Sequence, residues 1–202
     1  MIKKFFAKFQ YNSPVILTYT LICAAALLVN YLTKGWANEH LFSVYRSRLF
    51  DIMQYVRMFT HIIGHANYAH FIGNFTVILL VGPMLEEKYG SGVILKMILI
   101  TAFVTGLVQV IFFPGTGLLG ASGIAFMLIL LSSFTNHDAG RIPITLILVA
   151  VIYLSGEVID GLVKNDNVSH LGHIIGGLCG TAFGWAISKP KAPEQTQPQL
   201  PG

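Results

Sequence analysis

The amino-acid sequence predicts an all-α membrane protein, a bundle of six transmembrane helices with an interfacial first loop. Of its 202 residues, 54% are hydrophobic and 11% are charged, whereas a soluble domain carries about 25% charged residues. Six apolar stretches approach the roughly 20 residues that a helix needs to cross a bilayer. They cover residues 15–33, 69–85, 93–113, 119–135, 142–160 and 169–187. We therefore expect residues 15–188 to form one domain surrounded by lipid.

The first apolar stretch follows a short basic lead-in, residues 1–14. We interpret this stretch as a spanning helix and not as a cleaved signal peptide, because it is long and lacks a clean small-residue cleavage site. With a cytoplasmic N-terminus, the inner segments hold more lysine and arginine than the outer ones, as the positive-inside rule requires. The tail, 189–202, is then a disordered cytoplasmic segment. A bacterial inner membrane fits a chain with no organelle presequence.

The longest connection, residues 34–64, is too apolar for a solvated loop and too charged for a membrane span. It mixes aromatic and aliphatic residues with charged ones such as Arg46 and Arg57. This mixture favours an amphipathic helix that lies in the membrane interface. We expect such a helix in the outer leaflet.

Charge and cysteine content narrow the choice of partners. The formal net charge of +4 gives no indication of nucleic-acid binding. The two cysteines, Cys23 and Cys179, both lie inside apolar stretches. We interpret them as small packing residues and expect no disulfide.

Polar residues inside membrane spans are costly and are candidates for function. Here they cluster at the start of three spans. His70 and Asn74 open the second span, Ser122 opens the fourth, and His170 and His173 open the sixth. Even-numbered spans all begin on the outer side if the N-terminus is inside. The three groups should therefore lie at a similar depth, just below the outer surface.

The spacing of these residues suggests how the helices meet. His70 and Asn74 are four residues apart and share one helix face. On the sixth span, one stripe is formed by His170, Ile174, Gly177, Thr181 and Gly184. Small residues let helix backbones approach closely in lipid, and the fourth span begins with small residues too. Contact between these faces would bring His170 to Ser122, as a serine nucleophile and its base require.

Four sequence pieces in this order carry a family resemblance. They are His65, then His70-x-x-x-Asn74, then Gly120-Ala121-Ser122-Gly123, then Ser169-His170 before a glycine-rich helix; the stretch 86–92, EEKYGSG, also fits. Over roughly residues 57–187 the chain resembles the rhomboid intramembrane serine proteases, in their compact bacterial six-helix form.

The resemblance implies a serine endopeptidase that cuts transmembrane segments of other membrane proteins and needs no cofactor. Ser122 would attack the scissile carbonyl, and His170 would take its proton. His70, Asn74 and the Ser122 backbone N–H would stabilise the oxyanion. Supporting residues would be His65, Phe126, Gly120 and Gly123. The resemblance also suggests a lateral substrate gate between the second and fifth spans.

Two residues depart from the family pattern. Phe126 occupies the position, four residues after the serine, where the family often has a tyrosine that stacks on the catalytic histidine. His173 occupies a position where a small residue is more usual, and it competes with His170 as the base or tunes its pKa. The small Ser169 and the spacing to Gly177 favour His170. No carboxylate is placed to orient either histidine, so we expect a Ser–His dyad.

Two other functions use the same residues. An inactive rhomboid-like protein would bind transmembrane clients without cutting them, although an intact Ser122 and His170 argue against it. A histidine-based metal transporter could use the cluster of His61, His65 and the histidines that follow. The chain lacks the HExxH motif of membrane zinc proteases, so we expect no metal.

Overall fold

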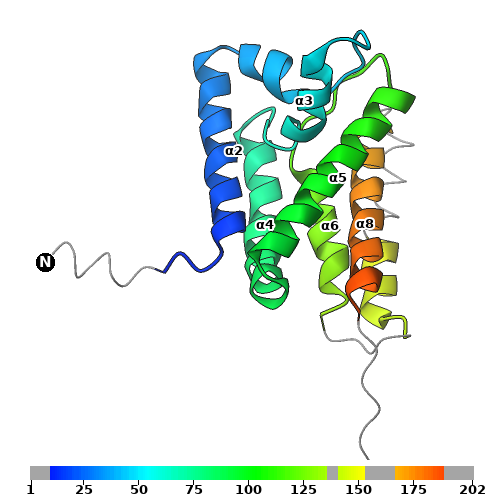
Figure 1. The fold of residues 1–202 in the computed structure, drawn as a ribbon. Coiled ribbons are helices and arrows are strands. Elements are labelled where there is room, and N and C mark those ends of the chain that lie inside the picture. The colour runs from blue at the N-terminus through cyan, green and yellow to red at the C-terminus, as the bar shows by residue number, and fades with distance from the viewer. Residues whose placement is uncertain (1–9, 136–140, 153–166, 189–202) are drawn as a thin grey trace, which may run out of the picture.

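The computed structural model of the 202-residue chain describes residues 10–135, 141–152 and 167–188. Within these ranges the chain forms a bundle of helices (Figure 1). They are α2 (Pro14–Leu32), α3 (Ile52–Thr60), α4 (Tyr68–Tyr89), α5 (Ser91–Phe112), α6 (Ser122–Ser132) and α8 (Asn167–Ile187). Residues 144–152 are helical as well.

The long helices agree with the apolar stretches of the sequence. α2, α4 and α5 are each long and apolar enough to cross a membrane. Together with α8, they confirm the first, second, third and sixth predicted helices. The helix over 144–152 begins where the fifth span was expected, and the rest of that span lies outside the described residues. An all-helical membrane bundle is therefore confirmed, whereas the number of six spanning helices stays a prediction.

The fourth predicted span is wrong at its start. Gly120 has a φ of +130°, a conformation that favours glycine, and the chain turns there instead of continuing a helix. α6 begins only at Ser122, and its residues from Ile124 to Leu131 are all buried. It packs against α4, α5 and α8. Figure 1 shows this central helix starting part-way along the bundle.

The first connection contains a single π-helical turn, η1 (Asn38–Phe42), and the amphipathic helix α3. α3 lies at one end of the bundle and packs against α5 (Figure 1). The closest approach is at Gly106, where an added Cβ would lie 2.8 Å from the Met58 Cα. Apolar side chains on the other face of α3, such as that of Ile52, are exposed. This arrangement is what an interfacial helix requires.

Arginine side chains hold this connection in place. The Arg57 guanidinium is 3% exposed and forms an ion pair with Asp51, with 3.1 Å between Nη2 and Oδ2. Arg46 donates to the carbonyls of Val110 and Ile111, each at 2.7 Å. These carbonyls belong to the last turn of α5, which has no helical partner for them. The first connection is thereby fixed to the C-terminal end of α5.

At the opposite end, Glu86 joins three helices. Its carboxylate accepts hydrogen bonds from the backbone N–H groups of Val15 and Ile16, at 2.9 and 3.0 Å. It also accepts one from the hydroxyl of Ser91, at 2.6 Å. The two N–H groups belong to the first turn of α2 and have no partner within that helix. A side chain of α4 therefore caps α2 and contacts the start of α5.

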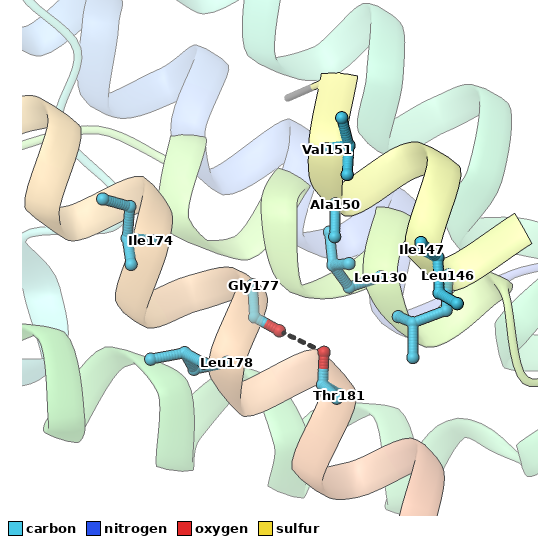
Figure 2. Close-up of a pocket in the computed structure, with 9 residues that line it drawn as sticks. All are labelled: Leu130, Leu146, Ile147, Ala150, Val151, Ile174, Gly177, Leu178 and Thr181. Carbon is cyan, nitrogen blue, oxygen red and sulfur yellow. Dashed lines mark hydrogen bonds between the residues drawn. The ribbon is translucent and has the colours of Figure 1, made fainter. Parts of the chain in front are cut away.

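An apolar hollow of about 330 Å³ lies between α6, the helix over 144–152 and α8. Figure 2 shows the residues that line it, among them Ile174, Gly177 and Thr181 of α8. The only polar side chain in this lining is that of Thr181, whose hydroxyl donates to the Gly177 carbonyl at 3.0 Å. Among the described residues, the lining of the hollow therefore offers no acid–base group.

Candidate active site

Ser122 is the first residue of α6 and follows a turn that is held on both sides. The Gly120 N–H donates to the His61 carbonyl at 2.9 Å. The Ala121 N–H donates to Nε2 of His65 at 3.4 Å. The N–H groups of the first helical turn, including that of Ser122, have no partner within the helix. They give this end of α6 a partial positive charge that favours an anion.

His70 and Asn74 of α4 face this turn. A Cβ added to Gly120 would lie 2.8 Å from His70 Nε2 and 3.8 Å from Asn74 Nδ2. His70 and Asn74 of the second predicted span therefore lie beside the turn that precedes Ser122, at a similar level along the bundle, as the sequence predicted. Position 120, two residues before the serine, must be glycine, because a Cβ there would lie 2.7 Å from Cε1 of the His70 ring.

The His70 ring is oriented by its surroundings. Asn67 caps α4 by accepting the His70 backbone N–H at 2.9 Å. The Ala66 N–H donates to His70 Nδ1 at 3.5 Å. A neutral imidazole that accepts at Nδ1 carries its proton on Nε2. His70 thus presents a donor N–H to the turn before Ser122.

Asn74 carries a buried donor that is not engaged. The side chain is 8% exposed, and within the described structure its Nδ2 has no hydrogen-bond partner. An unpaired buried donor costs about 1–3 kcal/mol. Such a group is retained where an acceptor arrives during function, because the acceptor then meets a donor already in position.

α8 packs against α6 through a row of glycines. A Cβ added to Gly176 would lie 2.8 Å from the carbonyl carbon of Gly123. A Cβ added to Gly180 would lie 2.9 Å from the carbonyl carbon of Met127. Gly123 itself approaches the carbonyl oxygen of Gly172, at 3.3 Å from its added Cβ. The fourth and sixth predicted helices therefore pack together through small residues, as expected for helices that approach closely in lipid.

The register of this contact differs from the predicted one. The predicted stripe of α8 ran through His170, Ile174 and Gly177. In the structure Ile174 and Gly177 line the apolar hollow (Figure 2), whereas the backbone contacts are made by Gly176 and Gly180. The closest backbone contacts thus run along Gly176 and Gly180, whereas Gly177 and Gly184 of the predicted stripe meet the side chains of Leu130 and Phe134.

The packing of α8 on α6 brings the His173 side chain into contact with α6. The His173 ring stacks on Phe126 with 4.6 Å between centroids and 5° between planes. Phe126 is one helical turn after Ser122, and His173 is three residues before Gly176. The His170 ring lies edge-on to the His173 ring, with 6.3 Å between their centroids. The stacking of Phe126 that was predicted for His170 is observed with His173 instead.

His61 and His65 are buried in the connection that precedes α4. His65 is fully buried, with Nδ1 3.1 Å from the Ile63 carbonyl. His61 is 2% exposed, with Nδ1 3.2 Å from the Arg57 carbonyl and Nε2 3.1 Å from the Thr105 hydroxyl. Burial lowers the pKa of each imidazole to about 4, so both are neutral near pH 7. Sequence reasoning missed that the His61 carbonyl holds Gly120, since a backbone acceptor leaves no residue signature.

Comparison with known proteins identifies the family. A family model for the Rhomboid domain matches residues 53–190. The chain belongs to the rhomboid family. This rhomboid is 31% identical over 142 residues to Rhomboid protease GluP of Bacillus subtilis (strain 168). The alignment covers 67% of the rhomboid chain and 27% of GluP, so the chain spans about a quarter of that relative's length. Family membership and the apolar helices together make it an integral membrane protein.

Proposed function

We propose that this rhomboid is an intramembrane serine endopeptidase with Ser122 as nucleophile. The observation that carries the proposal is the pair of donors facing the turn before the serine. His70 presents Nε2–H to that turn, and the buried Nδ2 of Asn74 lies beside it without a partner. Donors fixed in advance around a serine at a helix N-terminus suit a tetrahedral oxyanion.

His173 is our choice for the general base, in place of His170. Phe126, one turn after the serine, supports the His173 ring by parallel stacking. The face of α8 that carries Gly176 and meets Gly123 passes near His173. By its spacing, His170 shares its helix face with Ile174 and Gly177, which line the apolar hollow. The His173 imidazole is therefore better placed to reach the Ser122 hydroxyl.

The proposed reaction follows from these positions. The Ser122 hydroxyl attacks the scissile carbonyl as His173 accepts its proton. The oxyanion receives hydrogen bonds from His70, Asn74 and the Ser122 backbone N–H. The protonated His173 then gives its proton to the leaving amine, and water hydrolyses the acyl-enzyme. No carboxylate is needed to complete this dyad.

The substrates we propose are membrane proteins with a single spanning helix. A peptide bond inside a helix is shielded by neighbouring turns, so the helix must unwind before Ser122 can attack. Helix-breaking and small residues near the outer surface favour unwinding. We place the termini of this rhomboid in the cytoplasm and substrate entry between α4 and the fifth span.

Histidine-based metal transport is not favoured by the geometry of the connection before α4. Both ring nitrogens of His61 and both of His65 lie within hydrogen-bond distance of protein atoms. A ligating histidine needs one nitrogen with a free lone pair. These two side chains are therefore better explained as hydrogen-bonding residues that stabilise the connection than as metal ligands.

Three variants test the proposal on a model transmembrane substrate in liposomes. Ser122→Ala and His173→Ala should each abolish cleavage, whereas His170→Ala should retain a substantial part of it. A serine-directed fluorophosphonate should label the wild type and not the Ser122 variant. Retained cleavage by Ser122→Ala would refute the peptidase, and loss only in the His170 variant would return the base to His170. Absence of both cleavage and labelling in the wild type would favour an inactive binder.

A further inference from the structure

The short segment 61–65 holds the turn that carries the nucleophile. Two successive backbone N–H groups precede Ser122, those of Gly120 and Ala121. The first donates to the carbonyl of His61, and the second donates to Nε2 of His65. Ala121 and His65 are both fully buried, so water cannot replace the imidazole acceptor. The orientation of the turn therefore depends on His61 and His65, which are four residues apart in the sequence.

The His65 side chain can fill this role only in one protonation state. Its Nδ1 faces the Ile63 carbonyl, which is an acceptor, so Nδ1 carries the proton. Nε2 is then left with a lone pair, which receives the Ala121 N–H. The same ring contacts the His70 ring edge-on, with 5.2 Å between centroids. One imidazole thus touches both the serine turn and a donor that faces it.

The segment is itself anchored to α2 and to η1. The Asn38 amide donates to the His65 carbonyl at 2.9 Å. The Asn38 backbone N–H donates to the Asn30 side chain at 3.0 Å, near the end of α2. The Tyr19 hydroxyl donates to the Ile62 carbonyl at 2.7 Å. His65 is therefore held against α2 as it holds the serine turn.

We propose that His65 is a positioning residue of this peptidase, which sets the orientation of the Ser122 turn relative to His70. The inference rests on the proposed function. His65 is fully buried and cannot touch a substrate, so it acts through the Ala121 N–H and the His70 ring. Loss of its acceptor leaves a buried N–H unpaired, and the turn must then shift to find a partner. Chemistry depends on this alignment, whereas substrate binding does not.

Three replacements separate the acceptor from mere packing. In His65→Gln, the amide can bring an acceptor to the place of Nε2. In His65→Asn, the shorter amide reaches only the place of Nδ1, and in His65→Phe a ring remains without either nitrogen. His40→Gln is the matched control, because His40 is an exposed histidine of the same connection, stacked on Trp36.

We expect the Asn and Phe variants to lose roughly 10-fold to 100-fold in kcat with KM unchanged within about twofold. The Gln variant should recover most of the loss, and His40→Gln should match the wild type. The rate of fluorophosphonate labelling at Ser122 should follow kcat. Thermal unfolding of each variant in the same detergent shows whether the kcat order differs from the stability order.

Three results would overturn the inference. They are equal kcat in the Gln and Asn variants, a loss confined to KM, or labelling rates that follow the unfolding midpoints alone. A wild-type protein that is neither active nor labelled refutes the proposed function, and this inference with it. A labelled wild type with an equally labelled Asn variant refutes the role of His65 alone.

Discussion

The contact between α6 and α8 allows a sharp test, because two adjacent glycines of α8 differ in their surroundings. A Cβ on Gly176 would meet the backbone of Gly123, whose carbonyl carbon would be 2.8 Å away. A Cβ on Gly177 would meet only the end of the Leu130 side chain, at 3.6 Å. Ordinary van der Waals contact begins at 3.4 Å. Gly176→Ala must therefore push the helices apart, whereas Gly177→Ala fits.

The expected magnitudes follow from this difference. Overpacking costs about 1–3 kcal/mol, and alanine recovers up to about 1 kcal/mol of helix propensity. Gly176→Ala should therefore leave the unfolding free energy slightly reduced, by about 1–2 kcal/mol. Because Gly123 follows Ser122 directly, the same displacement moves the serine from the histidines of α8. A shift near 1 Å can cost about 100-fold in rate.

The assay compares both variants with the wild type. Cleavage of a model substrate gives kcat, and unfolding in detergent gives stability. Gly177→Ala should be as active as the wild type and equally or more stable. Equal activity and stability of the two alanine variants would refute the assigned register of α8 on α6.

Three further predictions concern other contacts. Glu86→Gln should lower the unfolding free energy by about 1–3 kcal/mol with kcat unchanged, because an amide cannot accept all three hydrogen bonds that the carboxylate receives beside the N-terminus of α2; a large fall in kcat at full stability would contradict this. Gly120→Ala should abolish cleavage, since its φ is +130° and its Cβ would collide with a histidine ring; an active variant would show that the turn is free to move. Acidification from about pH 6.5 to pH 4 should reduce stability by on the order of 3 kcal/mol for each of His61 and His65, because their lowered pKa lets the unfolded chain bind protons that the folded chain excludes. The contribution of these two imidazoles should change little below pH 4, and His65→Gln should have a shallower slope of stability against pH between pH 6.5 and pH 4.

Hydropathy was sufficient to predict most helices, because a bilayer demands long apolar segments whatever their neighbours. α2 and α5 begin and end within a residue or two of the predicted bounds. The start of α6 was misplaced by three residues. The stretch before Ser122 is apolar enough to count as membrane-spanning, yet Gly120 adopts a backbone conformation that no hydropathy scale detects.

The candidate site was predictable in its parts and not in their register. Spacing alone placed His70 and Asn74 on one face of α4, and the structure turns that face toward Ser122. On α8, glycines at 176, 177, 180 and 184 offered two overlapping small-residue faces. Only the position of the Gly123 carbonyl distinguishes them, and that position is a tertiary property. The choice between the two α8 histidines depended on it.

If this rhomboid is the peptidase proposed above, the short length of α6 has a consequence for which proteins it can cut. Eleven residues of α-helix extend about 16 Å, roughly half the thickness of a bilayer's hydrocarbon core. In that proposal the nucleophile at the start of α6 lies below the membrane surface, and a client must bring its breakable bond to that depth. The depth in the membrane at which a client helix can unwind then determines whether it is cut. A thinner or thicker membrane would change that depth without any change in the sequence of either protein.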